Sequence, residues 1–141
     1  MGDAICKIKI ITRFEFGQGY FTGGEIIKVY ILDTGGPGLD KMLAWLSENN
    51  SIKEVSVIKS PDTFLERVER ERPEMVIIRL GNSDIPGLKI GRMVKAMDQE
   101  ISIVFVSDER DYALDAYEVG AYGYLLCPLE RNRFNNLFNR G

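Results

Sequence analysis

The chain has 141 residues, of which 45% are hydrophobic and 28% charged, and its net charge is −3 at pH 7. This length suits one domain with a hydrophobic core, and the composition is that of an ordinary globular protein. The small negative charge creates no basic field for nucleic acid or an anionic membrane, so we expect this domain itself to bind neither. No apolar run reaches the roughly 18 residues of a membrane helix, and residues 1–16 lack the layout of a secretory signal.

The sequence contains no histidine. Its absence excludes Ser-His-Asp triads, Cys-His dyads and histidine-ligated zinc or haem sites. Two cysteines, Cys6 and Cys127, lie far apart and form no CxxC pair, so we expect reduced thiols in a cytoplasmic protein. We therefore expect no enzymatic activity, no cofactor and no metal.

Residues 1–24 do not follow the pattern of the remaining chain. Residues 5–16 and 20–21 either form an extra β-hairpin around residues 17–19 or belong to an appended leader without a role in the fold. Both alternatives stay open at this point. We divide the chain into an N-terminal extension, residues 1–24, and a domain, residues 25–141.

From residue 25 onward, strands and helices are predicted to alternate. Apolar runs predict strands at residues 26–32, 53–58, 75–78, 101–106 and 122–126. Helical spacing of apolar residues predicts helices over residues 39–46, 61–72, 90–97, 111–119 and 134–138. Ser60 and Pro61 are typical of a helix start, and Gly120 of a helix end. Because the third and fourth strands are apolar on both faces, we expect an α/β fold, (βα)5, with a doubly wound parallel sheet in the strand order 2-1-3-4-5.

Polar side chains follow the predicted strands at the edge where such sheets bind ligands. Asp33 and Thr34 come after the first strand and Arg79 after the third, and Ser107 and Cys127 follow the fourth and fifth. The first and third strands are neighbours in the expected order, about 4.8 Å apart. We therefore expect Asp33 and Arg79 to pair.

Five segments resemble, in order and spacing, the signatures of response-regulator receiver domains. These segments are KVYILD, PEMVIIR, DIPG, IVFVSD and ALDAYEVGAYGYLLCPL. The resemblance covers residues 26–141, and the last segment is most similar to receivers that precede LytTR-type DNA-binding domains. It implies a flavodoxin-like, CheY-like fold, with a possible β extension at the N-terminus, and a role in two-component signal transduction. It also implies that any DNA-binding part of a transcription regulator lies outside this chain.

The receiver mechanism implies particular residues, and this sequence departs from them. Two acids after the first strand normally hold Mg²⁺, but here Thr34 stands beside Asp33. The phospho-acceptor position, six residues after the proline that opens the third strand, is Arg79. Counted back from the later Pro-Gly, the acceptor position would be Asn82. Cys127 replaces the usual lysine after the fifth strand.

Two receiver positions are kept, the hydroxyl Ser107 and the switch aromatic Tyr124. Without a carboxylate nucleophile, and with a guanidinium that repels Mg²⁺, we expect no aspartyl phosphorylation. Asp84 is either a displaced acceptor or a turn residue, and the turn is favoured. Cys127 is either a redox sensor or a small buried hydrophobe. The glycine-rich residues 35–38 are either an anion cradle or a plain turn.

We therefore favour a degenerate receiver that signals through protein contact. The expected surface is the face of the fourth helix, fifth strand and fifth helix, where a protein partner or a second copy would bind. Tyr112, Tyr117 and Tyr122 are candidates for it, because aromatic residues are enriched at interfaces. The alternative is a small-ligand or redox sensor that uses the pocket of Asp33, Arg79, Ser107 and Cys127.

Overall fold

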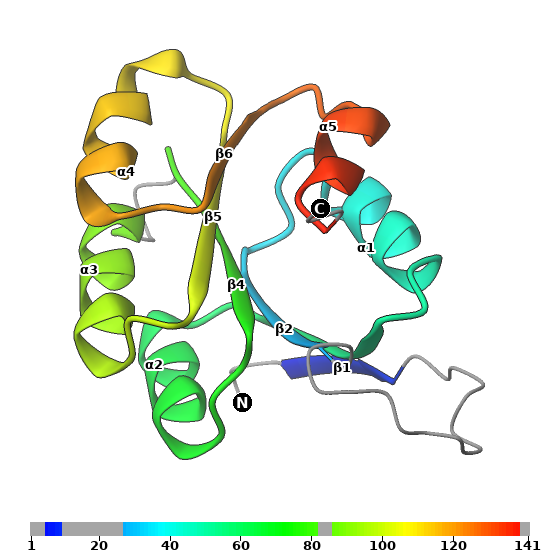
Figure 1. Cartoon of the computed structure of the whole chain (residues 1–141), viewed down its shortest axis with the longest axis horizontal. Coiled ribbons are helices and arrows are strands. Elements are labelled where there is room, and N and C mark those ends of the chain that lie inside the picture. The colour runs from blue at the N-terminus through cyan, green and yellow to red at the C-terminus, as the bar shows by residue number, and fades with distance from the viewer. Residues whose placement is uncertain (1–4, 10–26, 82–85, 139–141) are drawn as a thin grey trace.

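The computed structural model describes residues 5–9, 27–81 and 86–138, and in these residues the strands form one six-stranded sheet (Figure 1). The strands are β1 (Ile5–Lys9), β2 (Ile27–Leu32), β3 (Ile52–Ile58), β4 (Met75–Arg79), β5 (Ser102–Ser107) and β6 (Gly123–Leu126). Their order is β1-β3-β2-β4-β5-β6, and β2 to β6 are all parallel. Because β2 to β6 are the five predicted strands, the expected order 2-1-3-4-5 is confirmed.

Helices cover both faces of this sheet. They are α1 (Leu39–Ser47), α2 (Pro61–Arg70), α3 (Gly87–Met97), α4 (Ala113–Val119) and α5 (Arg131–Asn136). In Figure 1, α2, α3 and α4 lie on one side of the sheet, and α1 and α5 on the other. None of the helices within the described residues is long and apolar enough to span a membrane.

The two helical layers produce two hydrophobic cores. Alternate residues of β2 point to opposite faces, so Tyr30 joins the core beneath α2, α3 and α4, and Ile31 the core beneath α1 and α5. Phe64 and Phe105 are fully buried in the first core, and Phe134 is 1% exposed in the second. Burial of each such side chain contributes about 1.5–3 kcal/mol to folding.

The predicted helix signals act as expected. The Ser60 hydroxyl accepts the Thr63 N–H at 3.3 Å, and Pro61 occupies the first turn of α2. Gly120 ends α4 at a φ of 93°, a left-handed conformation that favours glycine. The helix expected at residues 111–119 begins instead with a 3₁₀ turn, Arg110–Tyr112, before the α-helical part. Such turns are frequent at helix starts.

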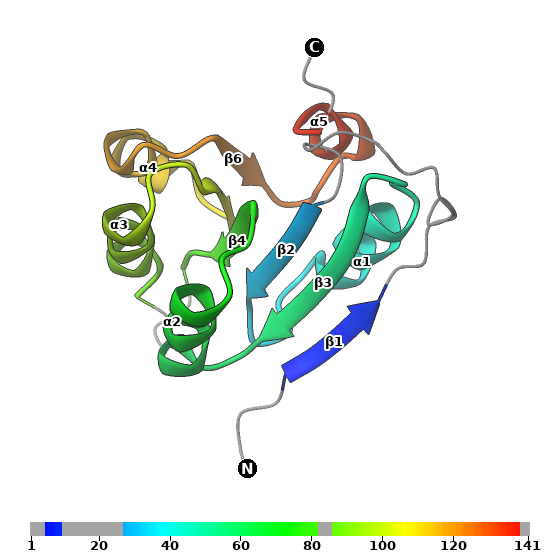
Figure 2. The same cartoon turned by 60° about the horizontal axis from the view of Figure 1, so that its bottom comes forward.

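β1 extends the sheet beyond the five parallel strands. It pairs antiparallel with β3 at the edge, placing Ile5 opposite Ile58 and Lys9 opposite Glu54 (Figure 2). One strand of the N-terminal region thus joins the fold. The second half of the expected hairpin, residues 20–21, lies outside the described residues, and the division at residue 24 stays a prediction.

Candidate functional site

Most of the polar residues expected at the sheet edge meet at the carboxyl ends of the parallel strands. Asp33 directly follows β2, and Arg79 ends the neighbouring strand β4. Leu32 lies opposite Ile78 in the register, so the next residues of the two strands stand at the same level. Cys127, directly after β6, reaches the same place from the other side of β5, where its N–H donates to the Ser107 carbonyl at 2.9 Å. Strand order therefore brings Asp33, Arg79 and Cys127 to one edge of the sheet.

Asp33 and Arg79 form a buried ion pair. Arg79 Nη2 lies 2.9 Å from Asp33 Oδ2, and Arg79 Nε lies 3.1 Å from the same oxygen. The Arg79 side chain is 5% exposed and the Asp33 side chain 1%. The other carboxylate oxygen, Oδ1, accepts the N–H groups of Gly35 at 2.9 Å and Gly36 at 2.8 Å. The carboxylate thus accepts two guanidinium and two backbone N–H groups. Hydrogen bonds of this charged kind are among the strongest in proteins, and here they leave little capacity for another ligand.

Arg79 is held on its remaining sides as well. Its Nη2 donates to the Pro37 carbonyl at 2.6 Å, and its Nη1 lies 3.6 Å from Cys127 Sγ. The guanidinium also packs against Gly36, where an added Cβ would stand 2.8 Å from Arg79 Cζ. Burial by itself lowers the pKa of Arg79, but the hydrogen bonds and charge of Asp33, assisted by Cys127, raise it above its usual value. The guanidinium is therefore charged at every physiological pH.

The glycine-rich turn has a definite partner. Gly35 and Gly36 donate their N–H groups to Asp33, so the anion that they bind is the chain's own carboxylate. Gly38 then begins α1 with a φ of 91°, which only glycine adopts readily. Sequence reasoning left an anion cradle and a turn as alternatives, and this segment is a turn that closes on an internal anion.

The residues at this edge do not fit the Mg²⁺ ion that a receiver implies. Asp33 already accepts four N–H groups, and the Arg79 cation stands where a second carboxylate would be needed. Thr34 is exposed and brings no carboxylate. Nowhere in the described ranges do three Asp, Glu, His or Cys side chains gather in a way that could hold a metal ion. Mg²⁺ prefers oxygen ligands that include carboxylates, so the donor set is wrong in both charge and number.

Ser107 and Tyr124 meet at the loop that follows β5. The fully buried Ser107 hydroxyl accepts the Glu109 N–H at 2.9 Å, and the Tyr124 hydroxyl donates to the Glu109 carbonyl. Burial raises the pKa of Tyr124 above the ordinary 10.0, and a hydrogen bond with Ser107 acts in the opposite direction. Both kept positions thus fasten the same loop residue, and neither contacts the Asp33–Arg79 pair in any hydrogen bond of the described residues.

Other predicted residues lie elsewhere. Asn82 and Asp84 fall outside the described residues. Tyr112 packs partly into the core, whereas Tyr117 is 78% and Tyr122 40% exposed. Cys127 is half-buried, and so matches neither a fully buried hydrophobe nor an open thiol.

Sequence reasoning missed the Pro37 carbonyl, and it did not identify Asp33 as the anion that the two glycine amides bind. The glycines and the proline next to Asp33 were visible in the sequence. A backbone partner, however, depends on the path of the turn, which the residue types alone do not specify.

Comparisons with known proteins agree with this architecture. Residues 32–139 match the family described as response regulator receiver domain. The chain is 34% identical over 116 residues to the sensory transduction protein LytT of Bacillus cereus, covering 77% of this chain and 44% of that protein. It is 27% identical over 115 residues to an uncharacterized response regulatory protein of Yersinia pestis, covering 82% and 48%.

Solved receiver structures share the fold. The response regulatory domain of mrkE from Klebsiella pneumoniae superposes with a TM-score of 0.70 at 16% identity, covering 79% of this chain and 91% of that one. The chemotaxis response regulator CheY4 of Vibrio cholerae gives 0.67 at 16% identity, covering 82% and 98%. The chain spans about half the length of the curated relatives that it matches. The five sequence segments, the strand order and these matches agree, and the chain belongs to the response regulator receiver domain family.

Proposed function

We propose that this chain is an atypical receiver domain that acts in signal transduction by protein–protein contact, without phosphorylation of an aspartate. The domain then serves as a docking or dimerisation module of a cytoplasmic regulator and has no enzymatic role. The chain matches only 46% of the transcriptional regulatory protein LytR of Staphylococcus aureus, which supports a transcription regulator whose DNA-binding part lies outside this chain.

One observation carries the proposal, the buried pair of Asp33 with Arg79. Phosphoryl transfer to a receiver needs a carboxylate as nucleophile and a metal ion to neutralise the moving charge. Arg79 and Asn82, the two residues that the sequence offers at the acceptor position, are no nucleophiles of this kind, and both oxygens of Asp33 accept internal N–H groups. The pair thus takes over the electrostatic role of metal and lysine in holding the edge together.

The surface around α4 supports contact with a protein. Leu114 is 68% exposed and Tyr117 78%, and Tyr122 stands just after the same helix. These are the largest exposed apolar side chains near the face formed by α4, β6 and α5. Aromatic and large aliphatic side chains on a surface are typical of interfaces. The Tyr124 hydroxyl donates to the Glu109 carbonyl and so ties β6 to the loop before α4.

The phosphorylation claim is tested by intact-mass analysis after incubation with acetyl phosphate and Mg²⁺. We expect no mass increase of one phosphoryl group, while a receiver with all its acidic residues, treated in parallel, gains it. A stable adduct on this chain would overturn the proposal, and peptide mapping would show whether Asp84 carries it.

The interface claim is tested by sedimentation equilibrium over a wide concentration range. We expect self-association that the double variant Leu114→Arg, Tyr117→Arg abolishes, whereas Lys41→Glu, exposed on α1, leaves it intact. A wild-type chain that stays monomeric at the highest concentration would eliminate the homodimer.

One observation favours the alternative, a redox or small-ligand sensor. The half-buried Cys127 Sγ lies 3.6 Å from Arg79 Nη1, so a thiol and a guanidinium stand side by side at this edge of the sheet. However, Arg79 already donates to Asp33, Pro37 and Cys127, so at most one of its five N–H groups is left for a ligand. A thermal-shift panel of carboxylates, nucleotides and oxidants tests the alternative. Marked stabilisation by one compound, lost in Arg79→Ala, would favour the sensor.

A further inference from the structure

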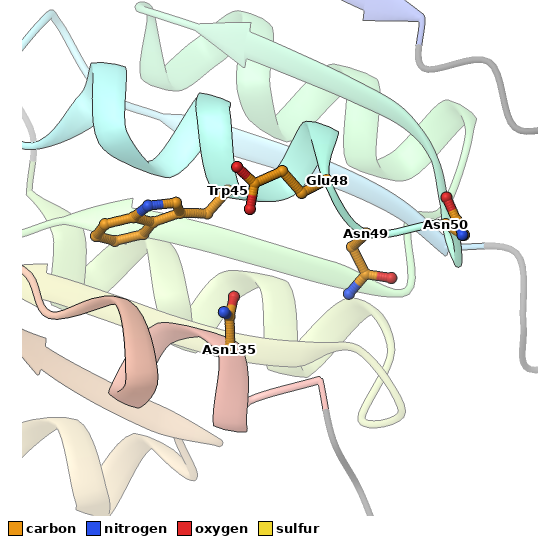
Figure 3. Close-up of a pocket in the computed structure, with 5 residues that line it drawn as sticks. All are labelled: Trp45, Glu48, Asn49, Asn50 and Asn135. Atoms are coloured by element: carbon orange, nitrogen blue, oxygen red, sulfur yellow. The ribbon is translucent and has the colours of Figure 1, made fainter.

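On one side of the sheet, opposite charges on the neighbouring helices α1 and α5 meet within the chain. Glu48 of α1 is bound to Arg131 of α5 in an ion pair. Glu48 also lines an open pocket between the end of α1 and α5 (Figure 3), and the other lining residues are Trp45, Asn49, Asn50 and Asn135. These charges are therefore satisfied inside one copy of the chain.

On the other side of the sheet, the neighbouring helices α3 and α4 carry charges of opposite sign. The two helices lie side by side (Figure 1), and a Cβ added to Gly91 of α3 would stand 3.5 Å from Val119 Cγ1 of α4. The charged residues of α3 are all basic, namely Lys89, Arg92 and Lys95, and those of α4 are all acidic, namely Asp115 and Glu118. A basic helix thus stands beside an acidic one.

Most of these charges do not find a partner in the chain itself. Lys95 is used internally, since its Nζ donates to the carbonyls of Gln99 and Ile101 at 3.0 Å each. The other four side chains, Lys89, Arg92, Asp115 and Glu118, are exposed, and none of them forms an ion pair with another described residue. Although the helices are neighbours, their charges stay available to another molecule.

Each helix also exposes a large apolar side chain next to its charges. Met93 is 40% exposed and lies one turn after Lys89, and Leu114 is 68% exposed and lies one turn before Glu118. Residues four apart share one face of a helix, so both apolar side chains accompany the charged ones. Exposed apolar groups beside charges are a common composition of protein interfaces. We call this surface the α3–α4 face, and it consists of Lys89, Arg92, Met93, Leu114, Asp115 and Glu118.

The two pairs of charges stand at nearly the same height on their helices. Arg92 follows Gly91 and Glu118 precedes Val119, the two residues at which the helices touch. Each pair spans three residues, about 4.5 Å along the helix axis. A two-fold axis that passes between α3 and α4 therefore places α3 of each copy on α4 of the other, in antiparallel directions.

This arrangement pairs every one of the four charges. Lys89 then meets Glu118 of the second copy, and Arg92 meets its Asp115, and the two-fold axis repeats both pairs. The face is thus complementary to itself. A partner of a single charge sign would match only one of the two helices and would be repelled by the other.

We propose that a second copy of this chain docks on the α3–α4 face about such a two-fold axis. The inference rests on the proposed function, because it names the partner of the domain and gives Leu114 of α4 a contact. The face consists of parts of two short helices, so it is small for an interface, and we expect a dissociation constant on the order of 10 µM. Because the ion pairs lie at the surface, the association should weaken as the salt concentration rises.

Two charge-reversed variants of the whole chain test this arrangement by sedimentation equilibrium. The acidic variant is Lys89→Glu, Arg92→Glu, and the basic variant is Asp115→Lys, Glu118→Lys. In each variant α3 and α4 have the same sign, so like charges face each other and self-association should weaken at least about tenfold. An equimolar mixture of the two variants should associate again, because α3 of each variant then meets an α4 of opposite sign.

A matched control separates the position of the charges from the net charge. Lys41→Glu, Lys59→Glu reverses two exposed lysines outside α3 and α4 and gives the chain the same net charge as the acidic variant. This control should associate as the wild type does. Circular dichroism checks that all the variants are folded.

Three results would overturn the inference, and they differ in what they leave of the proposed function. Wild-type association that both charge reversals leave unchanged, but that Leu114→Arg, Tyr117→Arg abolishes, would place the dimer on the face of α4, β6 and α5. Failure of the mixture to associate would eliminate the reciprocal pairing of α3 with α4. A wild type that stays monomeric at the highest concentration would eliminate the second copy as partner, and a different protein would then remain as the partner of the domain.

Discussion

The two ends of strand β2 carry ion pairs of very different character. At its carboxyl end, Asp33 and Arg79 meet at 2.9 Å with side chains 1% and 5% exposed. At its amino end, Lys28 meets Glu71 at 2.9 Å, but these side chains are 29% and 44% exposed. Nearby, Arg67 lies 3.3 Å from Glu54 and 3.6 Å from Glu71, so several charges share one network.

The comparison shows that distance alone does not decide what an ion pair contributes. Water can replace a lost partner at the amino end, and Glu71 has a second cation close by. At the carboxyl end both side chains are buried, so the loss of one partner leaves a buried charge. Breaking a buried pair costs about 3–5 kcal/mol, whereas an exposed pair is worth about 0–1 kcal/mol. Three experiments test this contrast.

The largest effect is expected for Arg79→Met. The variant leaves the Asp33 carboxylate buried with two backbone N–H groups and no counter-ion, so the free energy of unfolding should fall by about 3–5 kcal/mol. Urea denaturation followed by circular dichroism measures the change. The double variant Asp33→Asn, Arg79→Met should recover most of the loss, because no charge is then left unpaired. Simple addition of the two single effects would refute the view that the residues act as one unit.

A smaller effect is expected for Arg67→Met at the amino end. The substitution removes the ion pair with Glu54. It also removes the guanidinium that lies over the Tyr30 ring, with Cζ 5.0 Å from the ring centroid, whereas the methionine side chain still fills the space. Arg67 itself is only 9% exposed, but its partners Glu54 and Glu71 are 17% and 44% exposed and stay accessible to water when the cation is removed. The free energy of unfolding should therefore fall by about 1–2 kcal/mol, less than for the fully buried pair. Arg70→Met is the control, since the Arg70–Glu66 pair is exposed and 3.9 Å apart. A loss as large as that of Arg79→Met would remove the contrast between the two ends.

The smallest effect is expected from alkaline pH. The hydrogen bond to Glu71 raises the pKa of Lys28 above 10.5, and burial raises the pKa of Tyr30 above 10.0. In both cases the fold favours the protonated form, so this stabilisation is complete below the unfolded-state pKa and is lost as pH rises through the folded-state pKa. The midpoint of urea unfolding should therefore be lower at about pH 11 than at about pH 8.

Two variants assign this loss to the amino end. Lys28→Met and Tyr30→Phe should each reduce the difference between the two pH values, because they remove a titrating group. Arg79→Met should not reduce it, because the raised pKa of Arg79 keeps the guanidinium charged in this range. A pH difference that vanished in Arg79→Met instead would place the titration at the carboxyl end.

Much of the fold and part of the site follow from the sequence by itself. Apolar runs and helical spacing predicted all five parallel strands and their helices, because these patterns are local. The pairing of Asp33 with Arg79 was also predictable, since both residues end strands that a doubly wound sheet places side by side. The sequence also predicts departures from the receiver pattern at Thr34, Arg79 and Cys127.

Only the tertiary structure decided the contacts that depend on how distant segments approach. The Pro37 carbonyl and the glycine amides complete the Asp33–Arg79 site through the path of one turn. The pocket of Trp45 and Asn135 exists because α1 and α5 pack on the same face of the sheet. Neither arrangement produces a periodic pattern of residue types in the sequence. Local patterns record which face of an element is buried, whereas the partner of a backbone group or of a surface side chain is set by long-range packing.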